Sequence, residues 1–357
     1  MTRVLIVGGG FVGRAIAGAL ERAGGEPVLA CRNRPARCPR VRAPAGQTKP
    51  VAMDTAWQVR QDAADVARWV RLDATDAAGC AEVVHEVKPD AVIAVHGPSD
   101  VTWCQRHPQA ALEAHLTATD NLVRATGTAR LLMISTDNVF DGVAELNDEE
   151  SPTAPANAYG RAKLAAETVV HSHPDATVLR VSLVYGPQTP TPGKRPNFAA
   201  SCARDLRAGR AVHAPADQWT TPVHVGDVAT VALAAVREAP RLLHLGGPER
   251  LSRADWARRL ADLTKAPRTL VTDVARDAGP YACRPANSCL TSRLLPDLLH
   301  TWGLSVRGVD EGAADLLEDC IRHAATMGGV DGSTPHGGDR PDHRRRDTGG
   351  LHPADPA

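Results

Sequence analysis

One glycine-rich turn constrains the fold of this chain more than any other stretch. The apolar residues Val4–Val7 predict a short buried strand, and the turn follows it directly. A helix is predicted from Arg14 to Ala23. Glycines spaced as GxGxxG between a strand and a helix let the backbone and the helix N-terminus approach a pyrophosphate. The turn therefore predicts an α/β fold with a doubly wound parallel sheet, and its candidate cofactor contacts are Gly8, Gly10, Phe11, Val12 and Gly13.

The next predicted strand, Pro27–Ala30, bears on the choice of cofactor. Its end would meet the adenosine ribose, where an acidic residue binds the 2′-hydroxyl of NAD. The chain has Arg32 and Arg34 there instead. Guanidinium groups suit a 2′-phosphate, so NADP(H) is favoured over NAD(H). Arginines solvated on a loop are the alternative interpretation.

A second pair of motifs carries the predicted chemistry. The buried strand Leu131–Ile134 leads into Ser135–Asp137, and Tyr159 opens a helix on which Lys163 shares its face. An ammonium beside a phenol lowers the pKa of the phenol. Tyr159 could then pass a proton to a carbonyl oxygen while a hydride arrives, with Thr136 donating a second hydrogen bond to that oxygen. A surface tyrosine near a solvated lysine is the alternative.

Further elements follow from apolar periodicity. The predicted strands are 69–73, 91–95, 177–184 and 242–247, and the predicted helices are 77–87, 109–125, 159–171 and one that Ser252 caps.

Composition excludes several classes of protein. Lys plus Arg and Asp plus Glu both number 41, so the zero net charge predicts no nucleic-acid or anionic-membrane partner. No apolar run is long enough to span a bilayer and no signal peptide precedes the first strand, so a cytoplasmic protein is expected. The 8 cysteines form no CxxC pair, which favours reduced thiols over disulfides or a metal site.

With these motifs the chain resembles the extended short-chain dehydrogenases/reductases. Within them it is most similar to the dTDP-4-dehydrorhamnose reductase family, which also contains the regulatory β subunit of methionine adenosyltransferase. The resemblance covers roughly residues 4–325. It implies a Rossmann domain in residues 1–186, rejoined by about 222–247, and a smaller substrate-binding lobe from 187–221 and 248–326.

The resemblance also implies roles for residues at the strand ends. An acidic residue at the end of the third strand lies near the adenine in the family, which points to Asp73. His96 stands in the turn beside the nicotinamide ribose, where it is either a functional contact or a polar cap on the strand. His115 replaces a family asparagine that organises a proton-relay water, and an imidazole can also hold a water.

Four residues are candidate substrate contacts through the resemblance. Leu183 stands where the family has a tryptophan near the sugar, and Asn138 stands where it has a tyrosine. Trp219 lies in a stretch that resembles the substrate-side loop DQxGxPT. Arg284 begins a match to RPxNSxL, where its guanidinium could pair with a nucleotide diphosphate or could simply tie the lobe together.

The function that the resemblance implies is NADPH-dependent reduction of a keto-sugar nucleotide of the dTDP-4-keto-6-deoxysugar type, as in deoxysugar biosynthesis. Tyr159 would supply the proton, Lys163 would tune it and hold the nicotinamide ribose, and Thr136 would polarise the carbonyl. Asp137-Asn138 lacks the Asp-Glu pair that a 4,6-dehydratase needs. A sugar-nucleotide epimerase holding NAD, and a non-catalytic NADP-binding regulatory subunit, are the alternatives.

The expected partner is therefore a small-molecule substrate, without a metal, and the sequence is compatible with a homodimer. Residues 34–65 are rich in Pro, Arg, Gln and Ala and predict an irregular insertion. Residues 327–357 contain no Phe, Trp or Tyr and cannot bury enough apolar surface to offset the entropy of ordering, so a disordered tail is expected.

Overall fold

The computed structural model describes residues 2–33, 68–188, 196–277 and 279–317, which all lie in one compact unit spanning residues 1–320. The predicted insertion over 34–65, the predicted tail over 327–357 and Arg34 lie outside the described residues.

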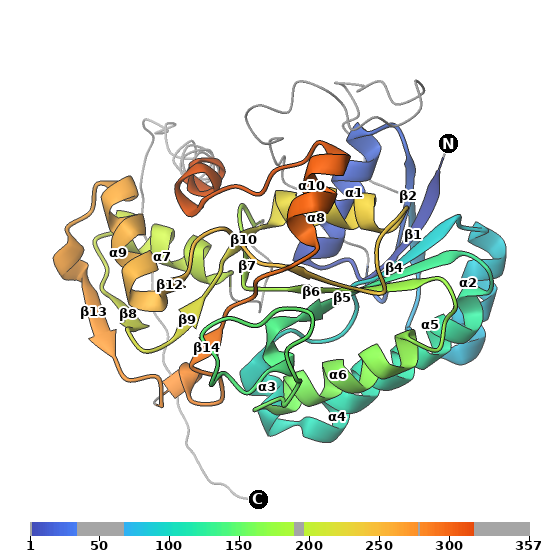
Figure 1. Cartoon of the computed structure of the whole chain (residues 1–357), viewed down its shortest axis with the longest axis horizontal. Coiled ribbons are helices and arrows are strands. Elements are labelled where there is room, and N and C mark those ends of the chain that lie inside the picture. The colour runs from blue at the N-terminus through green and yellow to red at the C-terminus, as the bar shows by residue number, and fades with distance from the viewer. Residues whose placement is uncertain (1, 34–67, 189–195, 278, 318–357) are drawn as a thin grey trace, which may run out of the picture. The chain divides into compact units, whose positions relative to one another are not determined.

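A seven-stranded parallel sheet forms the centre of this unit (Figure 1). Its strands are β1 (Arg3–Val7), β2 (Glu26–Cys31), β3 (Arg68–Arg71), β4 (Ala91–Ala94), β5 (Arg130–Thr136), β6 (Ala176–Val181) and β11 (Leu242–Leu245). The order is β11-β6-β5-β4-β1-β2-β3, and every neighbouring pair is parallel. The chain starts in the centre, moves out to β3 and returns to β4 on the other side of β1. This confirms the doubly wound fold and puts its switch point between β1 and β4.

Helices cover both faces of the sheet (Figure 1). One face carries α1 (Phe11–Arg22), α8 (Val225–Ala235) and α10 (Leu295–Trp302); the other carries α2 (Ala77–Val87), α5 (Ala118–Thr126) and α6 (Ala158–Val170). The strands supply apolar side chains to both layers, because successive residues of a strand point to opposite faces. In β1, Val4 and Ile6 belong to the first core, and Leu5 and Val7 belong to the second. This double burial explains why the predicted strands are continuous apolar runs.

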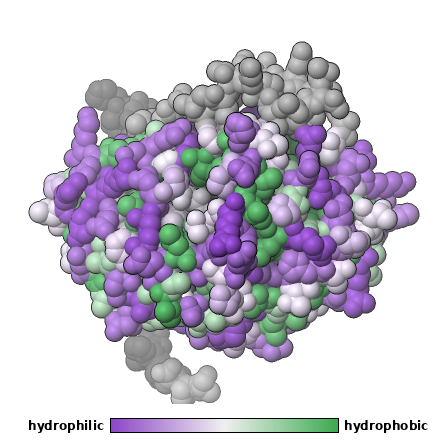
Figure 2. All heavy atoms as spheres, in the orientation of Figure 1, coloured by the Kyte–Doolittle hydropathy of each residue, from purple (hydrophilic) through white to green (hydrophobic). Residues whose placement is uncertain are grey.

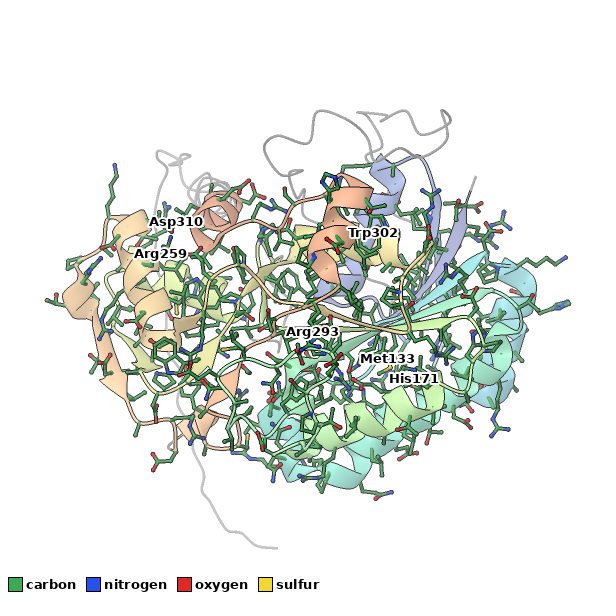
Figure 3. The ribbon with its side chains drawn as sticks, viewed as in Figure 1. Met133, His171, Arg259, Arg293, Trp302 and Asp310 are labelled. Atoms are coloured by element: carbon green, nitrogen blue, oxygen red, sulfur yellow. The ribbon has the colours of Figure 1, made fainter. Side chains whose placement is uncertain are left out.

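A third core lies outside the sheet. It packs α7 (Phe198–Arg207) and α9 (Arg253–Thr264) around Tyr185 and Trp256, with β8 (Val212–Pro215) and β13 (Val271–Val274) pairing beside them. On α9, Arg259 makes a two-pronged ion pair with Asp310, with both N–O distances at 2.6 Å (Figure 3). The smaller elements are β7 (Val184–Tyr185), β9 (Trp219–Thr220), β10 (Val223–His224), β12 (Leu251–Ser252), β14 (Asn287–Ser288), α3 (Val101–Arg106) and α4 (Pro108–Leu112).

Three predicted elements differ from the observed ones. The first helix begins at Phe11 rather than Arg14, because Gly10 already occupies the N-cap position. The strand predicted over 177–184 ends at Val181: the Ser182 amide still donates to the Leu245 carbonyl at 3.1 Å, but its hydroxyl bonds to Asp137 and to the Ser288 carbonyl, and Val184 belongs to the separate strand β7. The helix predicted over 109–125 is divided into α4 and α5 by a π-helical turn, Glu113–Thr117.

The surface is mixed in polarity. Figure 2 shows hydrophilic side chains interspersed with small hydrophobic patches on the face in view. The most exposed large hydrophobic residues of the described chain are Trp103, Val143, Leu146 and Leu294. Among the described helices, none combines the length and the apolar character needed to cross a membrane.

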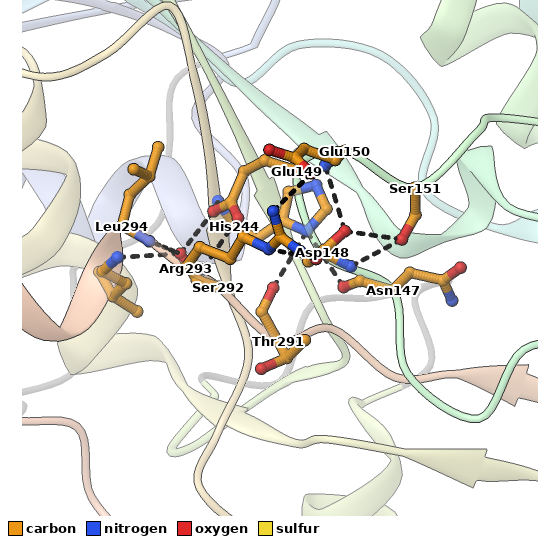
Figure 4. Close-up of polar contacts among 11 residues, drawn as sticks. Asn147, Asp148, Glu149, Glu150, Ser151, His244, Thr291, Ser292, Arg293 and Leu294 are labelled. Carbon is orange, nitrogen blue, oxygen red and sulfur yellow. Dashed lines mark hydrogen bonds and ion pairs between the residues drawn. The ribbon is translucent and has the colours of Figure 1, made fainter.

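A polar clasp fastens the loop after β5 to the segment before α10 (Figure 4). The Asn147 amide donates to the Cys289 carbonyl at 3.0 Å, and the Thr291 amide donates to the Asn147 carbonyl at 2.9 Å. The Glu149 carboxylate accepts from the backbone amide of His244 on β11 at 2.9 Å. It also accepts from the Ser292 hydroxyl, so one carboxylate joins three segments.

The clasp makes stability depend on pH through His244. The ring Nδ1 faces the carbonyls of Asn147 and Thr291, each at 3.2 Å. Because carbonyls only accept, Nδ1 carries the proton and Nε2 presents a lone pair to Arg180 at 3.3 Å. Burial lowers the pKa of His244, the Glu149 charge opposes this shift, and the Arg180 charge adds to it. Protonation of the His244 Nε2 would therefore place its N–H donor against the N–H donors of Arg180, with no acceptor between them.

Since the pKa of His244 is lowered on folding, the unfolded chain binds the proton more readily. The free energy of unfolding should fall as pH drops below about 6.5, the ordinary histidine value. His244→Gln removes this contribution. The gap in melting temperature between wild type and His244→Gln should be wider at pH 7.5 than at pH 5.5, both by calorimetry. An equal gap at the two pH values would show that His244 does not titrate as described.

Candidate active site

The glycine-rich turn lies at the switch point of the sheet. Gly8 has a φ of +126°, and a Cβ there would lie 2.6 Å from the Val95 carbonyl oxygen. A Cβ on Gly13 would lie 1.9 Å from the Gly8 carbonyl oxygen. Gly10 caps α1, whose first residues are Phe11 and Val12. The turn thus has the tight backbone and close helix packing that the spacing predicted, and it leaves helix N–H groups facing the switch point.

The candidate ribose contact Arg32 and the candidate adenine contact Asp73 lie together at the ends of β2 and β3. Arg32 and Asp73 are both exposed and each follows its strand. Hydrogen bonds from Thr75 lower the pKa of Asp73, and the nearby Arg32 charge lowers it further. The structure therefore brings these two predicted residues into one corner of the sheet edge.

The three predicted catalytic residues also come together. Thr136 is the last residue of β5, and Tyr159 and Lys163 lie on the first turns of α6. The helix starts there because the Asn157 side chain caps it, accepting from the Gly160 amide at 2.8 Å. The Thr136 hydroxyl is close enough to Tyr159 to lower the pKa of the phenol. The Lys163 ammonium is buried and donates to the Ile134 carbonyl at 2.7 Å.

The predicted direction of the tyrosine pKa shift is wrong. Burial raises the pKa of Tyr159, the Asp137 charge adds to the rise, and the hydrogen bond with Thr136 only opposes it. Burial also lowers the pKa of Lys163 to about 8, against the nearby Glu167 charge. The physical reason is desolvation, which disfavours the charged form of both groups. The phenol is therefore protonated at neutral pH, as a proton donor must be, although the raised pKa makes it a weaker acid than a free tyrosine.

Asp137 is a buried carboxylate that sequence reasoning did not single out as a site residue. Its side chain accepts from Thr136 at 3.0 Å, from Asn138 at 2.8 Å and from Ser182 at 3.2 Å. Burial raises the pKa of Asp137 to about 6 despite these bonds. Asn138 also accepts from Asn157 at 2.8 Å, so the side chain predicted as a substrate contact joins β5 to α6. Asp137 fixes the rotamer of the Thr136 hydroxyl.

Two histidines border the catalytic set. His115 lies in the π-helical turn, is fully buried, and its ring meets the Tyr159 ring edge-on at 5.6 Å. Its Nε2 is 3.1 Å from the Pro98 carbonyl, so Nε2 carries the proton. His96 lies 3.2 Å from the Thr119 hydroxyl, and burial with the Lys163 charge lowers the pKa of His96 to about 4. Both rings are therefore neutral at physiological pH.

The other three predicted substrate contacts, Leu183, Trp219 and Arg284, lie outside the seven-stranded sheet. Leu183 packs against the third core, and the Trp219 ring stacks under the guanidinium of Arg250 at 4.2 Å. Arg284 donates to the Thr102 hydroxyl at 3.1 Å and lines a cavity of about 290 Å³ together with Arg276. Among the predicted residues, Arg284 is the one that reaches this cavity.

The family follows from comparison with known proteins. The family model described as the RmlD substrate binding domain matches residues 1–320. The chain belongs to this family. Membership confirms the predicted assignment to the dTDP-4-dehydrorhamnose reductase-like extended short-chain dehydrogenases/reductases, and with it the class of NAD(P)-dependent oxidoreductase.

This RmlD-family chain is similar to three kinds of curated protein. It is 32% identical to a probable low-salt glycan biosynthesis reductase of Haloferax volcanii, over 58% of this chain and 71% of that protein. It is 32% identical to the dTDP-4-dehydrorhamnose reductase of Mycolicibacterium smegmatis, over 69% of this chain and 74% of that protein. It is 29% identical to the methionine adenosyltransferase 2 subunit beta of Pongo abelii, over 60% of this chain and 67% of that protein.

Solved structures of low sequence identity share the fold of the RmlD-family chain. A dTDP-4-dehydrorhamnose reductase of Bacillus anthracis in complex with NADP aligns with a TM-score of 0.67 at 22% identity, covering 90% of this chain and 99% of that one. A UDP-glucose 4-epimerase of Thermus thermophilus in complex with NAD aligns with a TM-score of 0.70 at 21% identity, covering 89% of this chain and 98% of that one. At these identities the likeness shows the fold alone.

Proposed function

We propose that this RmlD-family protein reduces the ketone of a sugar nucleotide with NADPH. The observation that carries the proposal is the meeting of Thr136, Tyr159 and Lys163 at the carboxyl end of β5, beside the glycine-rich turn. In open α/β sheets, ligands bind at the carboxyl ends of the strands near the switch point. The relatives of known name include dTDP-4-dehydrorhamnose reductases, which supports the same substrate class.

The residues of the turn fit a dinucleotide. Gly8 and Gly13 have no room for a Cβ, and the start of α1, where no side chain caps the helix, would present N–H groups to a pyrophosphate. Arg32 supplies a positive charge where the adenosine ribose would lie, and Asp73 would lie beside the adenine. When bound, NADPH supplies the hydride that converts the ketone to an alcohol.

The side chains of the chain itself would handle the proton. Tyr159 would donate its phenolic proton to the carbonyl oxygen of the substrate, and burial keeps that proton available at neutral pH. Thr136 would turn its hydroxyl proton from Asp137 to the same oxygen, because the hydroxyl has one proton and donates it to Asp137 in this structure. Lys163, fixed by the Ile134 carbonyl, would hold the nicotinamide ribose and favour the phenolate that remains after transfer.

The third core supports a separate substrate-binding lobe. It gathers residues from 198–214 and 251–317, within the predicted lobe of 187–221 and 248–326, together with Leu183 and Tyr185 from the end of the predicted cofactor domain. Asn138 and Leu183 replace the family's aromatic residues, so the sugar that fits the lobe differs in shape from the one those residues stack against.

The cofactor preference can be tested at Arg32. Arg32→Ala removes one charge-assisted contact to a 2′-phosphate, which is worth about 1.5–3 kcal/mol. NADPH affinity should fall by roughly tenfold to a hundredfold, while NADH affinity stays unchanged. Fluorescence titration with both cofactors measures this. Equal loss for NADH and NADPH, or no loss for either, would contradict the assignment.

The reaction itself can be tested with a panel of dTDP- and UDP-linked 4-keto sugars, following NADPH loss by absorbance. Oxidation of NADPH with at least one member supports the proposal. If NADPH binds tightly but no member of a broad panel is reduced, the result favours a non-catalytic, NADP-binding regulatory subunit over a reductase.

The second candidate function is a non-catalytic, NADP-binding regulatory subunit. The similarity to methionine adenosyltransferase 2 subunit beta favours it, at 29% identity over 67% of that protein. The complete Thr136, Tyr159 and Lys163 set favours catalysis instead. A third alternative, an epimerase holding NAD, has only the shared fold to support it, and Arg32 argues against it.

A further inference from the structure

Arg253 is a buried cation that the described residues leave without a hydrogen bond to its guanidinium. It is the first residue of α9, and its side chain has only 7% of its surface exposed. Its backbone amide donates to the Gln218 carbonyl at 2.9 Å, whereas its Nε has no acceptor. The guanidinium lies over the Phe198 ring, 4.7 Å from the centroid. A ring face attracts a cation but satisfies none of its N–H donors.

Burial of the Arg253 guanidinium without a hydrogen-bond acceptor is energetically unfavourable. A buried charge without a partner destabilises the folded chain, and burial lowers the pKa of Arg253 to about 10. An apolar side chain could pack on Phe198 without that cost. The Asp137 charge does not remove this cost, because the Asp137 carboxylate accepts its hydrogen bonds from Thr136, Asn138 and Ser182.

The position of Arg253 points to a ligand. Its charge acts on Asp137, which follows Thr136 directly, so the guanidinium lies near the catalytic set. The Arg284 charge acts on Arg253 as well, and Arg284 lines the 290 Å³ cavity with Arg276. Gln218, whose carbonyl accepts from the Arg253 amide, donates to the carbonyl of Pro285 in the cavity wall at 3.4 Å. Arg253 is therefore close to this wall, which carries two more guanidiniums, as well as to Asp137.

We propose that Arg253 binds an oxyanion of the substrate, at the border between the catalytic residues and the cavity lined by Arg276 and Arg284. The proposal rests on the proposed function, because it concerns a group of the same substrate. The forked N–H donors of arginine match the oxygens of a phosphate or a carboxylate. Both are available on a sugar nucleotide: the phosphates of the nucleotide, or a carboxylate on the sugar of a uronate.

Binding can be measured without turnover. Isothermal titration of the full chain with UDP and dTDP should give wild-type binding that Arg253→Gln weakens by about tenfold to a hundredfold. Arg253→Lys keeps the charge and should lose less. Arg258→Gln is the control, because Arg258 lies on the same helix and pairs with Asp255 at 3.2 Å on the surface. It should leave both affinities unchanged.

A second arm separates the two oxyanions. If the sugar carboxylate is the group bound, Arg253→Gln leaves UDP affinity unchanged but weakens UDP-glucuronic acid to the level of UDP-glucose. The inference is overturned if Arg253→Gln and Arg253→Lys have the same affinity as the wild type for every ligand. It is also overturned if the wild type binds none of these ligands. A large loss of melting temperature with unchanged affinities would likewise assign Arg253 to packing alone.

The same data distinguish this inference from the proposed function. If nucleotide affinity depends on Arg253 but no keto sugar is reduced, the reductase proposal fails and the oxyanion site stands. If a keto sugar is reduced with the same KM by wild type and Arg253→Gln, the oxyanion site fails alone.

Discussion

Tyr159→Phe should lower the turnover of keto-sugar reduction by about 10²–10⁴ while NADPH still binds. The substitution removes only the hydroxyl and keeps the ring against His115. Tyr185→Phe is the matched control, because the Tyr185 hydroxyl donates to the Gly308 carbonyl in the third core, away from the catalytic set. Steady-state kinetics with the best substrate of the panel measures both. Near-normal turnover in Tyr159→Phe would rule out the phenol as the proton donor.

The neighbouring residues extend that prediction into a pattern. Lys163→Met should reduce both turnover and cofactor affinity, since the ammonium is assigned two contacts. Thr136→Val should leave cofactor binding largely intact and slow the hydride step. It also removes a donor from Asp137 at 3.0 Å. A variant set in which all three residues affect only stability would indicate a structural role for the whole cluster.

Glu167→Ala should give the largest loss of stability, about 3–5 kcal/mol in the free energy of unfolding. Glu167 on α6 and Arg180 on β6 form an ion pair at 2.7 Å, with side chains 2% and 6% exposed. The carboxylate also accepts from the Ser135 hydroxyl. Removing it leaves the Arg180 charge buried without its carboxylate partner, next to the lone pair of His244.

Urea unfolding followed by circular dichroism measures this loss. Asp120→Ala is a suitable control, because Asp120 pairs with Arg124 on the exposed surface of α5 and surface pairs contribute little. Its unfolding midpoint should stay close to that of the wild type. A Glu167→Ala midpoint as high as that of Asp120→Ala would show that the buried pair contributes nothing net.

The sequence predicted the parts of the site that short motifs encode. Gly8, Thr136, Tyr159 and Lys163 could be placed because a strand end, a turn and a helix start each depend on a few neighbouring residues. The apolar strands were equally readable, since both faces of the sheet are covered by helices. The cofactor and the family followed from the same motifs, and the proposed substrate class rests on them as well.

What the sequence could not predict depends on contacts between distant segments. The direction of the Tyr159 pKa shift reflects burial by the folded chain, which outweighs the effect expected from a lysine four residues away. Ser182 ends a strand early because it meets Asp137 and Ser288. Arg253 belongs to none of the motifs, because its surroundings come from Phe198, Asp137 and Arg284, which are distant along the chain.

The most direct measurement of the central claim follows the hydride itself. Wild-type protein is incubated with a keto-sugar nucleotide and NADPH that carries deuterium at the transferred position of C4, and the product is analysed by mass spectrometry. The account predicts an alcohol product that carries one deuterium at the former carbonyl carbon. A cofactor that remains reduced while the sugar is unchanged, or a product without deuterium, would contradict it.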